Sequence, residues 1–186
     1  MVILIGGAGH AGKTYMAQKL LEKYHYPYLS LDHLKMGLYR ADIGCGFTPL
    51  DSTEHISEKL WPIIAGIIKT NIENKQNITI EGCYLLPYLI NGLDEEYRKN
   101  IISFYLDFSQ NYIERFYDEK MLRFRDVIEA RGYENSFTKE QHIEETRHLK
   151  ELYAKENYFE ITADYQTEIE QVYAWIDKEV KKMLRD

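Results

Sequence analysis

The chain has 186 residues and a mass of 22.1 kDa, about the size of one domain. Its 23 Lys and Arg residues stand against 30 Asp and Glu, and the net charge of −7 argues against a nucleic-acid partner, which requires cations that neutralise phosphates. Apolar residues make up 45%, enough for one core, but no apolar run approaches the roughly 20 residues that span a bilayer. We therefore expect neither a nucleic-acid partner nor a membrane partner. The oligomeric state stays open between a monomer and a homodimer.

Cysteine content and the first residues bear on the compartment. Cys45 and Cys83 are too few for a disulfide framework, which favours a reducing environment. The apolar segment Val2–Ile5 follows Met1 directly, without the basic residues or the cleavage site of a signal peptide. We expect a cytoplasmic protein.

Short apolar segments alternate with helical patterns along the whole chain. Strands are predicted at 2–5, 28–31, 78–80, 101–106 and 158–161. Helices are predicted at 13–24 and 33–39, after cap residues at 51–54, at 109–131, from Thr138, and along a final apolar stripe from Ile169 to Met183. This alternation predicts an α/β fold with a parallel sheet in a single domain, 1–186.

Three local signals refine the helices. Pro62 lies inside the long apolar pattern that runs from Ile56 to Ile68, so we expect a kink or a break there. Thr138 and Gln141 have the spacing of a capping box. The segment 109–156 is unusually charged for core helices, and we expect it to project from the sheet as a lid.

One motif near the N-terminus indicates nucleotide binding. The sequence G-x-x-x-x-G-K-[ST] follows an apolar strand and opens a helix, the context in which glycines let successive N–H groups face phosphate oxygens. Its lysine would bridge the β- and γ-phosphates and its hydroxyl would bind Mg²⁺. The alternative is a chance match in a glycine-rich turn. We expect His10 to be a loop residue with its ring in solvent, not a catalytic one. The predicted nucleotide-binding residues are Gly7, Ala8, Gly9, His10, Ala11, Gly12, Lys13 and Thr14.

With this motif, the chain resembles the P-loop small-molecule kinases, the group that contains the adenylate, shikimate and gluconate kinases. The resemblance implies a three-layer P-loop NTPase fold, with a five-stranded parallel sheet in the order 2-3-1-4-5. It also implies an acceptor site beside the phosphate loop, a helical lid around 109–156, and an adenine site at the turn 162–164.

Asp32 follows the second predicted strand, at the sheet edge where ligands bind in open α/β folds. In the kinases that the chain resembles, an acidic residue here contacts the acceptor hydroxyl, so Asp32 would orient or deprotonate it. The alternative is that Asp32 caps the following helix. Lys35 and Arg40 either meet an anionic acceptor or are ordinary helix charges. The segment Leu31–Gly37 looks like that of bacterial proteins labelled 2-phosphoglycerate kinase.

Glu81 ends the third strand, at the usual position of the acidic residue that holds Mg²⁺ directly or through water. It departs from the usual pattern because the acid is Glu and because Thr79 interrupts the apolar strand. Metal binding and general-base work both remain open, and the alternative is a carboxylate that merely faces a loop.

Basic residues follow the fourth strand in the expected lid. In the resembling kinases, lid arginines stabilise the transferring phosphoryl group. Arg123 is our candidate for this role, and which of the lid cations acts stays open. The alternative is that these residues only form ion pairs on a solvent-exposed helix. This alternative is strong, because Arg115, Glu119 and Arg123 follow one another at four-residue spacing, and Arg125 has the same spacing to Glu129.

These observations predict an ATP- and Mg²⁺-dependent kinase that phosphorylates a small molecule, with Lys13, Asp32, Glu81 and Arg123 as catalytic residues and Thr14 and Glu81 as metal ligands. A nucleotide-dependent switch or slow NTPase is the main alternative. A toxin-like kinase that acts on a nucleotide sugar is a third.

Overall fold

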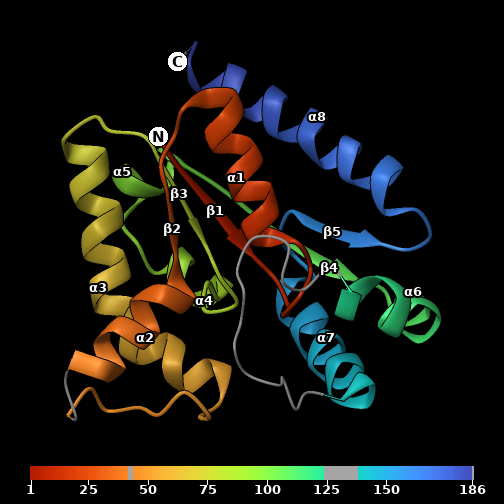
Figure 1. The fold of residues 1–186 in the computed structure, drawn as a ribbon. Coiled ribbons are helices and arrows are strands. Elements are labelled where there is room, and N and C mark those ends of the chain that lie inside the picture. Colours follow the sequence, from red (N-terminus) through yellow and green to blue (C-terminus); the bar gives the residue numbers. More distant parts are fainter. Residues whose placement is uncertain (42–43, 124–137, 186) are drawn as a thin grey trace.

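The computed structural model describes residues 1–41, 44–123 and 138–185. Five strands form one sheet in the order β2-β3-β1-β4-β5, and every neighbouring pair is parallel (Figure 1). The predicted fold class and strand order are therefore confirmed. The strands are β1 (Val2–Gly6), β2 (Tyr28–Ser30), β3 (Ile78–Glu81), β4 (Ile101–Phe108) and β5 (Tyr158–Ile161).

Helices connect the strands and cover the sheet. The first helix has the predicted bounds, and the predicted capping box is present, with each of Thr138 and Gln141 bonding the backbone of the other. The helices are α1 (Lys13–Tyr24), α2 (Leu31–Ala41), α3 (Thr53–Glu73), α4 (Pro87–Asn91), α5 (Glu95–Arg98), α6 (Gln110–Phe116), the π-helix η1 (Tyr117–Leu122), α7 (Lys139–Tyr153) and α8 (Tyr165–Met183).

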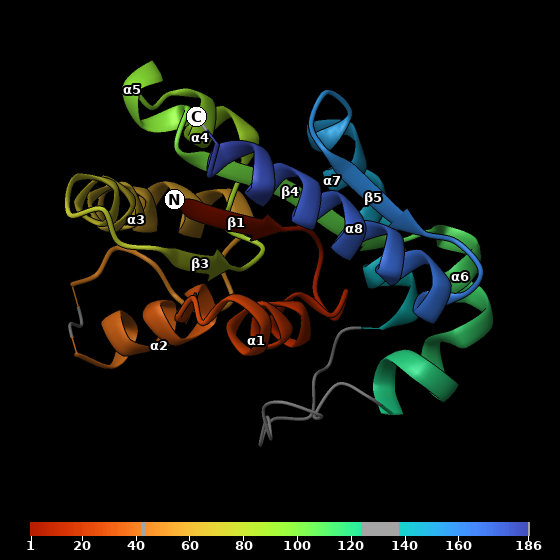
Figure 2. The ribbon, with the colours of Figure 1, turned by 90° about the horizontal axis from the view of Figure 1, so that it is seen from above.

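Alternate residues of the central strand serve two separate cores, which gives the molecule three layers (Figures 1 and 2). Ile3 and Ile5 of β1 pack with α1, α6 and α8 on one face. Val2 and Leu4 pack with α3, α4 and α7 on the other. Because a strand that is covered on both faces is apolar throughout, β1 has the continuous apolar run seen in the sequence.

Strand ends differ from the predictions where neighbouring strands extend the pairing. β3 includes Glu81, which pairs in register with Ile5, and β4 continues to Phe108, which pairs with Ile161. β2 ends at Ser30, because Leu31 already begins α2. Asp32 therefore lies inside the first turn of that helix, and the prediction that it caps the helix is wrong.

Pro62 does not break α3, which runs from Thr53 to Glu73. A proline in a helix removes one N–H donor and frees the carbonyl four residues earlier. Here Pro62 and Glu58 are both exposed, so water can satisfy that carbonyl. Ser52 caps the helix by accepting the backbone N–H of His55.

The charged segment 109–156 does not begin with one long α-helix. α6 ends at Phe116 and continues as the π-helix η1, and residues 124–137 lie outside the described residues. α7 packs on the sheet through Leu149 and Tyr153, and the Tyr153 ring stacks on Tyr105 at a centroid distance of 4.0 Å. This half of the expected lid belongs to the core.

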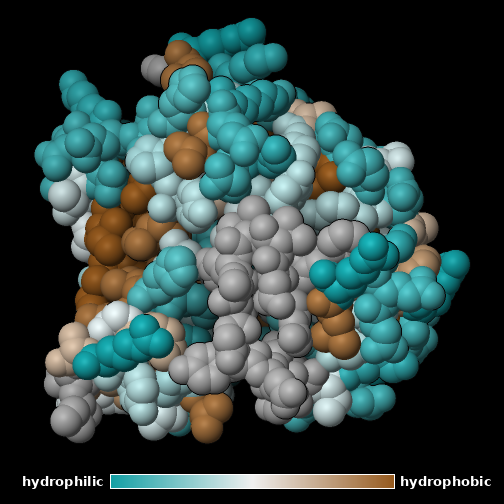
Figure 3. Space-filling model, viewed as in Figure 1, coloured by the Kyte–Doolittle hydropathy of each residue, from teal (hydrophilic) through white to brown (hydrophobic). Residues whose placement is uncertain are grey.

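The surface carries an apolar area over α3, where Ile63 is 40% exposed (Figure 3). Among the residues that the structure describes, no helix combines the length and apolarity needed to traverse a bilayer.

Candidate phosphate-binding site

Two glycines allow the loop between β1 and α1 to fold tightly against the sheet. Gly7 has φ 121° and Gly12 has φ 85°, conformations that residues with a Cβ rarely adopt. A Cβ at Gly7 would lie 2.0 Å from the carbonyl oxygen of Leu106, and one at Gly12 would lie 2.6 Å from the hydroxyl of Tyr165. The loop is therefore pressed between β4 and the start of α8, as a preformed cradle requires.

The start of α1 and the end of β3 bring two predicted site residues into contact. Thr14 Oγ1 donates a hydrogen bond of 3.1 Å to Glu81 Oε1. Lys13 is buried, and its ammonium donates to the carbonyl of Ala8 in the same loop. Glu81 does not face a loop, because it is 3% exposed at the end of β3.

The electrostatics of this pair follow from its burial. Burial raises the pKa of Glu81 above its usual value, while the charge of Lys13 and hydrogen bonds from Ser30 and Thr14 oppose the rise. A carboxylate that is buried and held by donors needs a cation nearby to remain ionised.

Asp107 is a site residue that the sequence analysis did not single out. It lies in β4, is 0% exposed, and accepts the backbone N–H of Ala8, whereas its Oδ2 has no hydrogen-bond partner among the described residues. Burial raises its pKa to about 7, although the Ala8 bond and Lys13 oppose the rise. The sequence could have marked Asp107 as a site residue, because it is an acidic residue near the end of an apolar strand, as Glu81 is.

Asp32 lies at the neighbouring strand end in a three-residue cluster. Lys35 Nζ donates to Asp32 Oδ1 at 3.1 Å and to the hydroxyl of Tyr84 at 2.7 Å. The Tyr84 hydroxyl in turn donates to Asp32 Oδ1 at 3.4 Å. The side chain of Asp32 is 33% exposed, so its carboxylate is accessible to a small molecule. Arg40, in contrast, is exposed in the last turn of the same helix.

α7 approaches the phosphate loop from the second face of the sheet. The rings of His10 and His142 meet edge to face at a centroid distance of 5.0 Å, so His10 is half-buried against α7, whereas the sequence predicted a ring in solvent. Burial lowers the pKa of His142 to about 4. Glu145, one turn further along α7, places its carboxylate beside Gly9, where a built Cβ would lie 3.8 Å from Oε2. No sequence pattern marked Glu145, because it lies in a run of charged residues.

The predicted lid cation lies on the surface. Arg123 is exposed directly after η1. Arg125 and Arg131 lie outside the described residues.

The turn expected to bind adenine has its backbone donors already engaged. Glu168 accepts the backbone N–H groups of Thr162, Ala163 and Asp164 at 2.6, 2.8 and 2.9 Å. A base at this turn would therefore meet carbonyl oxygens and side chains in place of these N–H groups.

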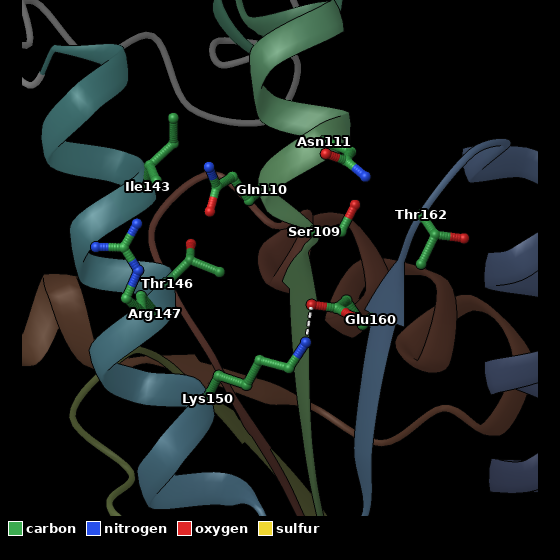
Figure 4. A pocket seen from close by; sticks show the side chains of 9 residues that line it. All are labelled: Ser109, Gln110, Asn111, Ile143, Thr146, Arg147, Lys150, Glu160 and Thr162. Atoms are coloured by element: carbon green, nitrogen blue, oxygen red, sulfur yellow. Dashed lines mark hydrogen bonds and ion pairs between the residues drawn. The ribbon is translucent and has the colours of Figure 1, made fainter.

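A pocket of about 490 Å³ adjoins this turn, and Figure 4 shows its side chains converging from α6, α7 and β5. At one side Lys150 and Glu160 form an ion pair of 2.6 Å. The lining residues are Ser109, Gln110, Asn111, Ile143, Thr146, Arg147, Lys150, Glu160 and Thr162.

No group of three or more His, Cys, Asp or Glu side chains that could hold a metal occurs in the described part of the chain. Mg²⁺ does not require such a cage, because it is commonly held by one or two protein oxygens together with water and substrate phosphates. The hydroxyl of Thr14 and the carboxylate of Glu81, 3.1 Å apart, fit that requirement.

Comparison with known proteins supports the fold. The chain matches no protein-family model, and no curated protein matches its sequence. Among solved structures, a shikimate kinase from Bacteroides thetaiotaomicron superposes with a TM-score of 0.59 at 15% identity, covering 95% of this chain and 98% of that one. The chain has the fold of the P-loop small-molecule kinases.

Two further structures with this fold extend the comparison. Deoxyadenosine kinase from M. mycoides with bound dATP gives a TM-score of 0.52 at 16% identity, covering 95% of this chain and 100% of that one. Shikimate kinase from Aquifex aeolicus gives 0.51 at 13% identity, covering 97% and 98%. At such identities the likeness concerns the fold, so the chemistry must be argued from this chain's own side chains.

Proposed function

We propose that this protein is an ATP- and Mg²⁺-dependent kinase that transfers the γ-phosphoryl group to a hydroxyl of a small molecule. The observation that carries the proposal is the contact between Thr14 and Glu81, beside the buried ammonium of Lys13. A hydroxyl, a strand-end carboxylate and a lysine, arranged around a loop of backbone donors, are the groups that bind a triphosphate with its metal ion.

The groups in and around the phosphate loop have distinct tasks in this proposal. The backbone N–H groups of the loop bind phosphate oxygens, and Lys13 leaves the carbonyl of Ala8 to bridge the β- and γ-phosphates. Thr14 and Glu81 hold Mg²⁺, which when bound neutralises phosphate charge. Arg123 supplies further positive charge from the lid.

Asp32 is the better candidate for the base. The carboxylate of Glu81 is buried and accepts a hydrogen bond from Thr14, whereas that of Asp32 is a third exposed. In the transfer, the acceptor oxygen bonds to the γ-phosphorus while the bond from that phosphorus to the β–γ bridging oxygen breaks. ADP leaves, and the acceptor proton passes to Asp32.

The test measures ADP release with ATP, Mg²⁺ and pooled metabolites, followed by the mass of the product. A kinase releases ADP much faster in one pool, and the product gains one phosphoryl group. A switch or slow NTPase gives the same low rate in every pool. Absence of Mg²⁺–ATP binding in calorimetry would contradict both the kinase and the switch or slow NTPase.

A further inference from the structure

A carboxylate from α7, that of Glu145, lies against the phosphate loop at Gly9. A Cβ built at Gly9 would lie 3.8 Å from Glu145 Oε2 and equally far from the ring of His142, so α7 covers the loop directly at this residue.

Lys13 also lies within electrostatic reach of Glu145. Burial raises the pKa of the Glu145 carboxyl, and the charge of Lys13 opposes that rise. Backbone N–H groups of this loop and its lysine are the donors that a phosphate chain requires. The carboxylate therefore competes with phosphate for these donors and also repels it.

The helix that carries Glu145 is anchored near its C-terminal end. Leu149 and Tyr153 are buried in the core there, and the capping box of Thr138 and Gln141 stabilises the first turn of the helix. A phosphate chain that enters the loop can therefore displace the flexible side chain of Glu145 more easily than the helix.

We propose that Glu145 is a positioning residue whose carboxylate lies against the phosphate loop at Gly9 while no nucleotide is bound, and that the phosphate chain must displace this carboxylate to bind. This inference rests on the proposed function and adds a determinant of nucleotide affinity to the same site. Removing the charge at this position then strengthens nucleotide binding, in contrast to the loss expected at Lys13, Thr14 or Glu81.

The experiment is calorimetry of Mg²⁺–ATP and Mg²⁺–ADP binding to the full chain. Glu145→Gln and Glu145→Ala each lower the Kd for Mg²⁺–ATP by about threefold to tenfold, as expected for loss of one charged competitor. Glu144→Gln is the matched control, because Glu144 is the preceding residue on α7 and its exposed side chain pairs with Arg147. This control leaves the Kd unchanged.

A second measurement separates electrostatic competition from a structural role. The gain in affinity of Glu145→Gln shrinks as salt is raised, because ions screen the repulsion that the wild-type carboxylate exerts. A side chain that only braced α7 would give weaker binding on removal, with a lower melting temperature and no such salt dependence. Glu145→Ala keeps the test available if the glutamine variant folds poorly, because alanine favours the helix.

Different outcomes contradict the proposed function and the role of Glu145. If the wild type binds neither nucleotide, the proposed function falls and this inference falls with it. If the wild type binds Mg²⁺–ATP and both variants bind it equally or more weakly, only the role of Glu145 is overturned.

Discussion

Thr14 Oγ1 donates a hydrogen bond of 3.1 Å to Glu81 Oε1, and this contact joins the first turn of α1 to the end of β3. The two residues are 67 positions apart in the chain, yet adjacent strands of the parallel sheet bring them together. The same geometry places a carboxylate and a hydroxyl beside the phosphate loop, where the buried Lys13 donates to the carbonyl of Ala8. The first three predictions test this arrangement and the neighbouring Asp32.

Replacing Lys13 by alanine should abolish nucleotide turnover, with a loss of at least about 100-fold, because no other described residue places an ammonium inside the loop. Lys19→Ala is the control, because Lys19 lies on the same helix, is exposed, and pairs with Glu22 at 2.7 Å. Steady-state ADP release measures both. Equal activity of the two variants would contradict the role of Lys13.

Glu81→Gln should raise the Mg²⁺ concentration for half-maximal activity by about tenfold or more, because it removes the carboxylate while retaining an oxygen that can accept from Thr14. Glu160→Gln is the matched control, because Glu160 also lies on a strand, β5, but pairs with Lys150. A Mg²⁺ titration of ADP release compares them. If both titrations coincide with that of the wild type, Glu81 is not a metal ligand.

Asp32→Asn should lower phosphoryl transfer by about 100-fold or more and leave Mg²⁺–ATP affinity unchanged, because the amide cannot accept the acceptor proton. Calorimetry and the acceptor-dependent rate give the two quantities. Asp94→Asn serves as control, because Asp94 is exposed and pairs only loosely with Lys69, at 3.7 Å. Transfer at the wild-type rate would make Asp32 a structural partner of Lys35 and Tyr84.

Asp107 should make the stability of the protein depend on pH. Its pKa is raised to about 7 in the folded state, so the folded state binds a proton more tightly than the unfolded state. The free energy of unfolding therefore falls as pH rises from the unfolded pKa through 7. Between pH 5 and 8, Asp107→Asn should remove about 2 kcal/mol or more of this decline.

Urea denaturation of both proteins at the two pH values checks this prediction. Glu81 and Glu145 also have raised pKa values and contribute a decline of the same sign, but they are present in both proteins. The difference between wild type and variant therefore isolates Asp107. If the free energies of unfolding of the two proteins ran parallel between pH 5 and 8, the carboxyl of Asp107 would not have a raised pKa in the folded state.

The fold could be predicted because its signals are local. A continuous apolar segment such as Val2–Ile5, the glycine and lysine spacing of the loop, and the Thr138–Gln141 capping box each depend on neighbours in sequence. The predicted strand ends were wrong where a partner strand extends the pairing, as at Phe108. The contact of Glu145 with Gly9 could not be predicted, because it joins residues that only tertiary packing brings together.

Two glycine substitutions should have opposite effects on the free energy of unfolding. Gly7→Ala places a Cβ 2.0 Å from the carbonyl oxygen of Leu106 at φ 121°, so β4 or the loop must shift, and the variant should lose about 3 kcal/mol or more. Gly66 lies inside α3 with nothing within 4 Å of an added Cβ, so Gly66→Ala should gain up to about 1 kcal/mol from helix propensity. Urea denaturation of both variants provides the comparison, and a Gly7→Ala protein as stable as Gly66→Ala would mean that the loop does not pack on β4 as described.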